Sequence, residues 1–306
     1  MISKKVLAKK VKESIPGWLF ILPTVAGLCI FTLAPIIQSV MYSFHDYDMT
    51  TKYDFVGLGN YIKMFRDPAV RTAFRNTLIF GAGNIAMVLV LTYALALLLN
   101  LKIPGIKIFR VVYYLPCVIP AIAGGILWSN IMKYGTESPG IFNQIRMFFG
   151  LSPSSYFFSS DLEAIRSILV MNLWSLGGGT IIWLAAFKNI PEQLYEAAEI
   201  DDAGRGRRLI SITIPMCTPM IFYNLIMNII GSLQTFGSVY TLTGGSTGEE
   251  NSLLFYLMKV YNDAFNFQGK TMGYACAESW VLFLIIAALT AVVFKTSKWV
   301  FYGEES

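Results

Sequence analysis

Seven ionisable side chains lie within thirteen consecutive positions of a chain in which only 14% of the residues are charged. Acidic residues come first and basic residues follow, in the segment EAAEIDDAGRGRR at positions 196–208. Long apolar runs stand on both sides, so this segment is expected to lie in water between two buried stretches. The seven residues are Glu196, Glu199, Asp201, Asp202, Arg205, Arg207 and Arg208.

Catalytic chemistry has few side chains to work with elsewhere in the chain. His45 is the only histidine, which leaves no material for a histidine-based metal centre or a catalytic triad. The cysteines form no CxxC pair and lie in or beside apolar runs, so they are predicted to be buried free thiols. They are Cys29, Cys117, Cys217 and Cys276.

The sequence also contains no complete phosphate-binding glycine motif. The segment AFNFQGKT at 264–271 approaches a P-loop, but Ala264 stands where the motif requires glycine. The glycines at 177–179 lie inside an apolar run. The chain is therefore predicted to contain no ATP-hydrolysing site, no metal site and no catalytic residue.

One apolar run carries polar residues on a single helical face. Asn224, Asn228, Ser232 and Thr235 fall within an arc of roughly 80° at about 100° per residue, and Gln234 flanks them. Polar groups facing lipid cost free energy unless they are paired. This face is thus expected either to hydrogen-bond another helix or to line a solute pathway.

A second run, at 165–187, offers a similar face. Asn172, Ser175, Gly179 and Trp183 share it, and an aromatic ring beside amides and hydroxyls suits a neutral polar solute such as a sugar. The residues predicted to line a pathway are Asn172, Gly179, Trp183, Asn224, Asn228, Ser232, Gln234 and Thr235.

These faces belong to an integral membrane protein. The chain is 55% hydrophobic, with a mean hydropathy of +0.56, and its long runs predict an all-α bundle of six transmembrane helices. The first run is too long for a signal-peptide core and is expected to be retained. The predicted spans are 17–44, 77–101, 111–132, 165–187, 219–240 and 273–294.

Lys and Arg placement predicts the orientation. With the N-terminus inside, the inner segments 1–16, 102–110, 188–215 and 295–306 hold 14 of the 24 basic residues, although they are the shorter set. Both termini and the charged segment are therefore predicted to be cytoplasmic. This gives an N-terminal segment at 1–16, a membrane domain at 17–294 with a cytoplasmic loop at 188–215, and a tail at 295–306.

Outer segments are less regular. Residues 45–76 are expected to form either an interfacial elbow along the headgroups or a solvated loop. Glu278, near the outer end of the last span, is expected to be either a functional intramembrane acid or a group that stays solvated at the interface.

The charged loop itself is predicted to contain a short helix. Pro191 suits its first turn, Glu192 favours its positive end, and Gly204 suits its C-terminal stop. A helix of about three turns is marginal alone in water, so it is expected to dock in a groove of another protein.

The spacing in this loop resembles a known family. Glu196-Ala197-Ala198, with Asp201, Ile212, Ile214 and Pro215 at later offsets, is similar to the signature of ABC importer membrane subunits. Asp202 stands where that signature has glycine, with Gly204 two residues later, and Ile214 replaces leucine. FVGLGNY (55–61), RNTLIF (75–80), FRVVYYLP (109–116), LTGG (242–245) and the run at 263–277 resemble the carbohydrate-uptake branch.

The resemblance implies a type I importer permease in a prokaryotic cell membrane. It implies that Glu196, Ala197, Ala198, Asp201, Asp202, Gly204 and Pro215 couple the chain to an ATPase. The implied partners are a second homologous permease, two ATP-binding subunits that use ATP and Mg²⁺, and an extracytoplasmic solute-binding protein. No cofactor bound by this chain and no nucleic acid partner are expected.

Two other classes are weighed against this one. An ion-coupled secondary transporter of a small polar solute is the alternative, although acids within the spans are scarce. A membrane enzyme ranks last, because a nucleophile–base pair and a metal cluster are both missing from the sequence.

Overall fold

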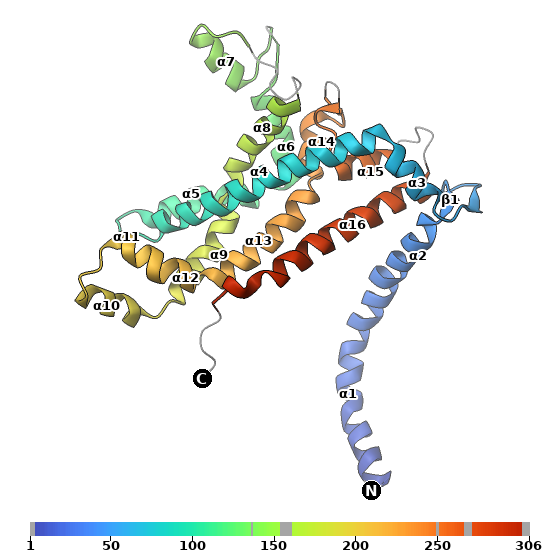
Figure 1. The fold of residues 1–306 in the computed structure, drawn as a ribbon, viewed down its shortest axis with the longest axis horizontal. Coiled ribbons are helices and arrows are strands. Elements are labelled where there is room, and N and C mark those ends of the chain that lie inside the picture. Colours follow the sequence, from blue (N-terminus) through green and yellow to red (C-terminus); the bar gives the residue numbers. More distant parts are fainter. Residues whose placement is uncertain (1–3, 136, 154–160, 249–250, 266–270, 302–306) are drawn as a thin grey trace. The chain divides into compact units, whose positions relative to one another are not determined.

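The computed structural model describes residues 4–135, 137–153, 161–248, 251–265 and 271–301. It is helical almost throughout (Figure 1), as the sequence predicts. The chain divides into two compact units: unit 1 comprises residues 1–66 and 261–281, and unit 2 comprises residues 67–260 and 282–306. Helices α15 (Tyr256–Phe265) and α16 (Met272–Lys295) contribute to both.

Unit 1 begins with a long helical run. Helix α1 (Lys4–Leu28) continues through a π-helical turn, η1 (Cys29–Leu33), into α2 (Ala34–Ser43). The π turn precedes Pro35, whose ring cannot accommodate a regular turn, and the N–H of Ala34 accordingly bonds Cys29 O. The apolar stretch 16–43 is long enough to cross a membrane and matches the first predicted span within one residue.

The segment expected to form either an interfacial elbow or a solvated loop has regular structure. Strands β1 (His45–Tyr47) and β2 (Tyr53–Phe55) form an antiparallel hairpin, and α3 (Gly59–Arg66) follows. The buried Asn60 amide donates to Ser43 O at 3.0 Å and His45 O at 2.9 Å, which fixes α3 to the end of α2. Backbone N–H groups of Lys52, Thr50 and Thr51 surround the Asp48 carboxylate and lower its pKa.

Unit 2 contains the remaining membrane helices. It begins with α4 (Pro68–Leu99), which starts earlier than the predicted 77 because Asp67 caps it, accepting the Ala69 N–H at 2.9 Å, and Pro68 occupies the first turn. Next come α5 (Ile106–Val118), α6 (Ala121–Ile131), α7 (Ile141–Phe148) and α8 (Asp161–Asn172), with the 3₁₀ turn η2 (Leu173–Ser175). The rest are α9 (Gly177–Lys188), α10 (Glu192–Ile200), α11 (Arg205–Arg208), η3 (Leu209–Thr213), α12 (Ile214–Met216), α13 (Thr218–Leu233), α14 (Gly237–Thr243) and η5 (Ser297–Trp299).

Two predicted spans are pairs of helices that bend by more than 40° where they meet. The third is α5 and α6, bent by 98° at residues 119–120, and the fourth is α8–η2 and α9, bent by 50°. Pro120 ends the first break, since proline cannot continue a helix, and glycine follows the second at Gly177. Among the described residues, four helical runs are long enough to cross a membrane, or six when each bent pair counts as one span.

Two apolar clusters lie at the ends of unit 2. The Phe255 cluster joins the start of α4 and α8 to α14 and α15, and the Trp183 cluster joins the ends of α4 and α9 to the start of α13. The runs α4, α8–α9 and α13–α14 each have residues in both clusters, which supports counting the bent pair α8–α9 as one span. The buried members of the Trp183 cluster are Ala96, Trp183, Phe187, Ile190 and Cys217. Those of the Phe255 cluster are Phe80, Ala164, Ile165, Ile168, Met171, Val239, Leu242, Leu253, Phe255 and Met258.

Polar side chains join the helices between these clusters. Asn84 of α4 donates to Ser232 Oγ of α13 at 2.9 Å and accepts from Asn172 Nδ2 of α8 at 2.9 Å. Small residues allow the close approach of other pairs: a Cβ on Gly125 of α6 would clash with Thr241 of α14. The bundle is therefore fastened by both shape and hydrogen bonds.

The predicted C-terminal stop of the loop helix is wrong in position. Helix α10 ends at Ile200, and Asp202 has φ 53°, in the left-handed region. The Asp202 N–H bonds Glu199 O at 3.1 Å and the Ala203 N–H bonds Ala198 O at 2.9 Å, which together form a Schellman motif. Gly204 instead has an extended backbone and precedes α11. The glycine of the resembled signature thus corresponds to a position that needs positive φ.

This geometry predicts the effect of restoring glycine. Asp202→Gly should relieve a left-handed strain of about 1 kcal/mol and slow amide hydrogen exchange in α10 by about two- to fivefold. Asp201→Gly is the matched control: Asp201 has φ −79°, so glycine there should speed exchange. Equal shifts of the same sign in both variants would contradict the assignment.

The Asn84 contacts predict a measurable stability loss. Asn84→Leu should destabilise the bundle by about 1 kcal/mol, because Asn172 and Ser232 lose their inter-helix partner. The midpoint of thermal unfolding in detergent measures this. Asn228→Leu is the control, since within the described residues the Asn228 side chain bonds only Asn224 O of its own helix. An equal loss there would argue against a role for the bridging contacts.

Candidate functional site

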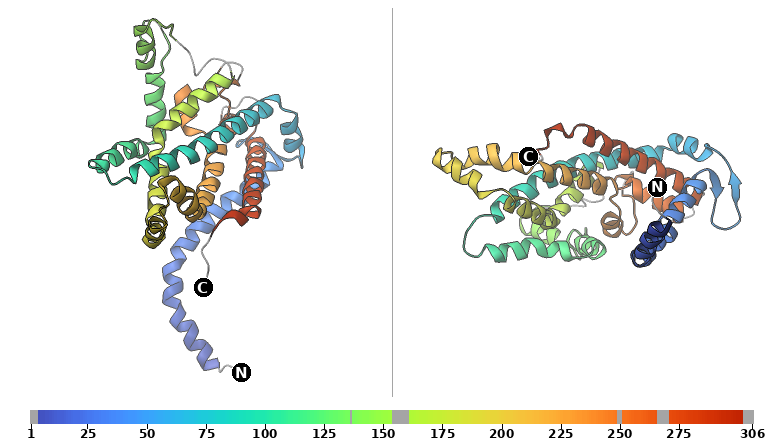
Figure 2. Two further views of the ribbon diagram at one scale, coloured as in Figure 1. Left: turned by 60° about the vertical axis from the view of Figure 1, so that its left-hand side comes forward. Right: turned by 90° about the horizontal axis from the view of Figure 1, so that it is seen from below.

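The segment that carries the sequence motif forms an exposed helix at one end of unit 2. Figure 1 and the left view of Figure 2 both place α10 at the end of this unit opposite to α7. Its start agrees with the prediction: Pro191 is the N-cap and Glu192 lies in the first turn. No residue of α10 is buried, so most of its surface is free to meet another protein.

One side of α10 is attached to the membrane helices. The Tyr195 hydroxyl and Thr213 Oγ1 are hydrogen-bonded at 2.9 Å, and both Tyr195 and Ile212 pack on the Trp183 cluster. Ala198 is half-buried on the same side. A displacement of α10 would therefore press directly on the cluster that joins α4, α9 and α13.

The opposite side of α10 is exposed. Glu196 lies there, about 100° from Tyr195 and about 160° from Ala198 at about 100° per residue, and Ala197 is exposed beside it. Ile200, one turn after Glu196 on the same face, is 87% exposed. Together with Ala197, it adds apolar surface to the exposed side of a charged helix. Its i+4 spacing from Glu196 is visible in the sequence, but its exposure is not.

Arg208 stabilises the turn after α10. Arg208 Nε donates to Ala203 O at 2.7 Å, whereas its 3.4 Å ion pair with Glu199 is exposed and contributes little. A polar hollow of about 420 Å³ lies beside this turn. Asp201, Ala198 and Arg207 line it, so two of the predicted coupling residues share this hollow.

Pro215 lies outside the α10 surface. It is half-buried in α12, its carbonyl accepts the Thr218 hydroxyl at 2.7 Å, and the π turn η3 precedes it. The N–H of Ile214 bonds Leu209 O across that turn. A proline at this point has no N–H for a regular helical bond, so it reshapes the link between the loop and α13.

The predicted pathway residues fall into two groups. Trp183 is 1% exposed and donates to Thr92 Oγ1 at 2.9 Å, Gly179 packs against Thr92, and Asn172 and Ser232 meet Asn84. For these four the structure favours the helix-packing interpretation. The second group has no helix partner among the described contacts: Asn224, Asn228 and Thr235 bond their own helix, and Gln234 is exposed. Pathway lining stays a prediction.

The end of α13 has a feature that the sequence did not indicate. The helix stops at Leu233, and Phe236 adopts a non-helical backbone before α14 begins at Gly237. Gln234 and Thr235 therefore lie at a break within a membrane span. Irregular backbone at membrane depth is tolerated where it is buried in protein or lines a cavity.

Three further sequence predictions concern Glu278, metal binding and the P-loop-like segment. Glu278 is fully buried, so the interpretation as a solvated acid is wrong. Within the described residues, no group of three His, Cys, Asp or Glu side chains could hold a metal ion. In the P-loop-like segment, Ala264 and Phe265 end α15, and residues 266–270 lie outside the described residues.

Residues 88–301 match the family described as "Binding-protein-dependent transport system inner membrane component". The chain is 33% identical to the probable ABC transporter permease protein YesP of Bacillus subtilis, over 95% of this chain and 93% of that protein. It is 31% identical to the lactose transport system permease protein LacF of Rhizobium radiobacter, over 92% of this chain and 94% of that protein.

A solved structure shares the fold. A bacterial ABC transporter involved in the import of the acidic polysaccharide alginate superimposes with a TM-score of 0.79 at 20% identity, covering 95% of this chain and 98% of that one. The family decides between the classes weighed from sequence, against the ion-coupled carrier and the membrane enzyme. The chain belongs to the binding-protein-dependent transport system inner membrane component family and is a multi-pass membrane permease subunit of an ABC transporter.

Proposed function

We propose that this permease imports a sugar or oligosaccharide together with a second homologous permease. The relatives support the substrate class: besides LacF, the chain is 29% identical to the trehalose/maltose permease MalF of Thermococcus litoralis and 29% identical to the multiple sugar-binding permease MsmF of Streptococcus mutans. An extracytoplasmic solute-binding protein delivers the sugar, and the chain itself performs no hydrolysis.

Helix α10 is the element that receives force from the ATPase. The observation that carries this proposal is its two-sided geometry, with Glu196 and Ile200 exposed and Tyr195 fixed to Thr213. The exposed side of α10 binds to one of two separate ATP-binding subunits, which use ATP and Mg²⁺. Their closure displaces α10, and the Trp183 cluster passes the displacement to the membrane helices.

The orientation follows from the same side of unit 2. Phe301 N–H bonds Thr218 Oγ1 at 2.8 Å, which brings the segment after α16 to the start of α13, beside the loop that carries α10. These segments are rich in Lys and Arg, so this end is cytoplasmic, and we place both chain termini there.

The mechanism is a two-state alternation. ATP binding on the cytoplasmic side favours the outward-open state, and the loaded binding protein favours the same state from outside. The polar face with Asn224, Asn228 and Thr235, next to the break at Gln234, is where a sugar would meet amides and hydroxyls. Its hydrogen bonds would replace those that the sugar makes with water.

Charge reversal on α10 tests the coupling role. Glu196→Lys should lower ATP-driven uptake in proteoliposomes at least about tenfold, because it places a positive charge in an interface that needs an acid. The assembled amount of the subunit in the membrane should stay unchanged. Glu137→Lys, an exposed acid in the loop between α6 and α7, is the control. Uptake at the normal rate by Glu196→Lys would overturn the coupling assignment.

Ile200 provides a second test at the same surface. Ile200→Asp should weaken ATPase association by about tenfold or more, since it replaces an 87% exposed apolar contact with a charge. Co-purification at graded salt measures this. Ile210→Asp, at a 68% exposed residue in η3, is the matched control. Equal weakening in both would show that any charge in the loop disturbs docking, and the specific role of Ile200 would be lost.

A further inference from the structure

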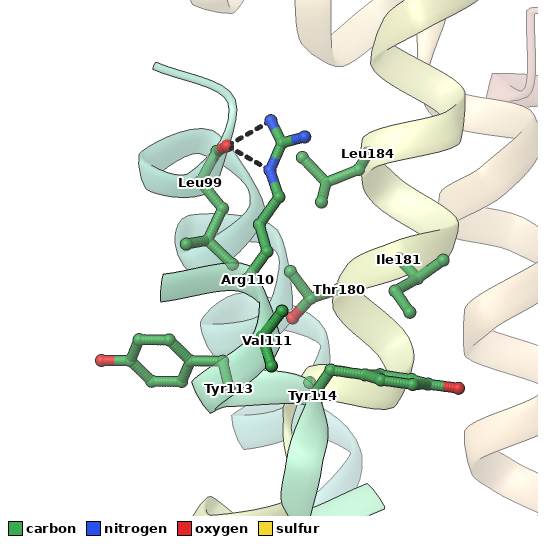
Figure 3. A pocket seen from close by; sticks show the side chains of 9 residues that line it. Leu99, Arg110, Val111, Tyr113, Tyr114, Thr180, Ile181 and Leu184 are labelled. Carbon is green, nitrogen blue, oxygen red and sulfur yellow. Dashed lines mark hydrogen bonds between the residues drawn. The ribbon is translucent and has the colours of Figure 1, made fainter. Parts of the chain in front are cut away.

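A cleft of about 270 Å³ lies between α5 and α9 in unit 2 (Figure 3). The two backbones touch at one end, where a Cβ on Gly177 would clash with the Tyr113 carbonyl. Cys117 reinforces this contact, because its Sγ accepts the Gly178 N–H at 2.9 Å and donates to Ser175 O at 3.3 Å. The closed end of the cleft is therefore fixed by direct backbone contact.

The walls of the cleft are apolar. Val111 is 65% exposed and Ile181 47% exposed in this chain, and Leu184 continues the wall toward the end of α9. Three of the lining residues carry a hydroxyl group. The Thr180 hydroxyl already donates to Leu176 O at 2.9 Å, and the Tyr113 and Tyr114 hydroxyls lie at the tips of rings that extend to opposite sides in Figure 3. Such a surface suits a hydrocarbon chain and gives a sugar almost nothing to bind.

A cation stands at the other end. Arg110 donates from Nε and Nη2 to Leu99 O at 3.1 and 2.7 Å, as Figure 3 shows. Leu99 is the last residue of α4, so the guanidinium is held at the level where a membrane span ends. Lys107 lies three residues before Arg110 on the same helical face and is exposed. Lys102 lies in the short link between α4 and α5.

We propose that this cleft binds an anionic phospholipid. Its acyl chain lies between Val111, Ile181 and Leu184, and its phosphate meets Arg110 and Lys107. The cations lie at the end of the membrane span and the apolar walls lie deeper, which matches the positions of a phospholipid's headgroup and acyl chains. Basic pockets between membrane helices recognise acidic headgroups in this way. The choice of the cytoplasmic leaflet rests on the orientation proposed above.

Competing ligands match only half of the cleft. A soluble phosphate would use the cations and leave the apolar walls empty. A neutral lipid would fill the walls and leave Arg110 and Lys107 without an anion. Only a lipid with a negative headgroup satisfies both parts.

Lipid binding to the complete, delipidated transporter tests the proposal. Native mass spectrometry compares phosphatidylglycerol with phosphatidylcholine of the same chains, and phosphatidylglycerol should bind more tightly. Lys107→Gln should reduce phosphatidylglycerol affinity about fivefold, and Lys107→Gln with Arg110→Gln roughly 30-fold, since each basic group near an acidic headgroup contributes a factor of about five. Phosphatidylcholine binding should not change.

Two further variants serve as controls, one for charge and one for the shape of the cleft. Lys295→Gln with Lys298→Gln removes the same charge at the end of α16 and should leave binding unchanged. Ile181→Trp keeps every cation and fills the cleft, so it should lower the affinity for both lipids. Lys107 makes no described hydrogen bond, so Lys107→Gln should assemble normally. Its lipid affinity therefore tests the proposal even if Arg110→Gln fails to assemble.

Three results would overturn the proposal. The first is phosphatidylglycerol binding that is unchanged in Lys107→Gln. The second is equal competition by glycerol phosphate, which would mean a soluble phosphate site. The third is a photo-crosslink from position 181 to the second permease in place of lipid, which would mean a subunit interface. None of these results bears on ATP-driven uptake, so the proposed transport function is tested separately.

Discussion

The packing around Trp183 is the constraint on which the end of unit 2 that carries α10 depends. Its indole is almost completely buried, bonded to Thr92 and set edge-on to Tyr93 with ring centroids 5.1 Å apart. Three membrane helices and the loop with α10 meet at this one cluster. Since protein interiors are close-packed, α10 cannot move far without moving these helices or losing the contact. Mechanical coupling between loop and bundle thus follows from packing alone.

The membrane imposes the second constraint, because backbone polar groups in lipid must be satisfied within the protein. Continuous helices meet it for α4 and α16, whereas three other runs break at Pro120, Leu176 and Phe236. These breaks are supported by neighbours: α6 touches α14 at Gly125, and α9 touches α5 at Gly177. Sugars require polar surface at membrane depth, and a broken helix is one way of providing it without charged residues.

The class of fold and the functional loop could be predicted because both depend on local patterns. Apolar run length indicated six spans, and proline followed by acid indicated where α10 begins. Gly204 does not mark the end of α10, because Asp202, two residues earlier, adopts the left-handed conformation that usually favours glycine. Asp67-Pro68 was a visible start signal that hydropathy alone overlooked. The burial of Trp183 depends on contacts with Thr92 and Tyr93, about 90 residues earlier in the chain, which a single sequence does not display.

The contact between Gly177 and Tyr113 has a mechanical consequence. Helices normally interlock through side-chain ridges that resist rotation of one against the other. At Gly177 no ridge separates the two backbones, so this contact and the Cys117 hydrogen bonds beside it would form the pivot of any rotation of α5 against α9. The width of the cleft beyond it would then vary as the transporter alternates between its two states. Membrane composition and transport rate would then be linked through this one contact between the Gly177 and Tyr113 backbones.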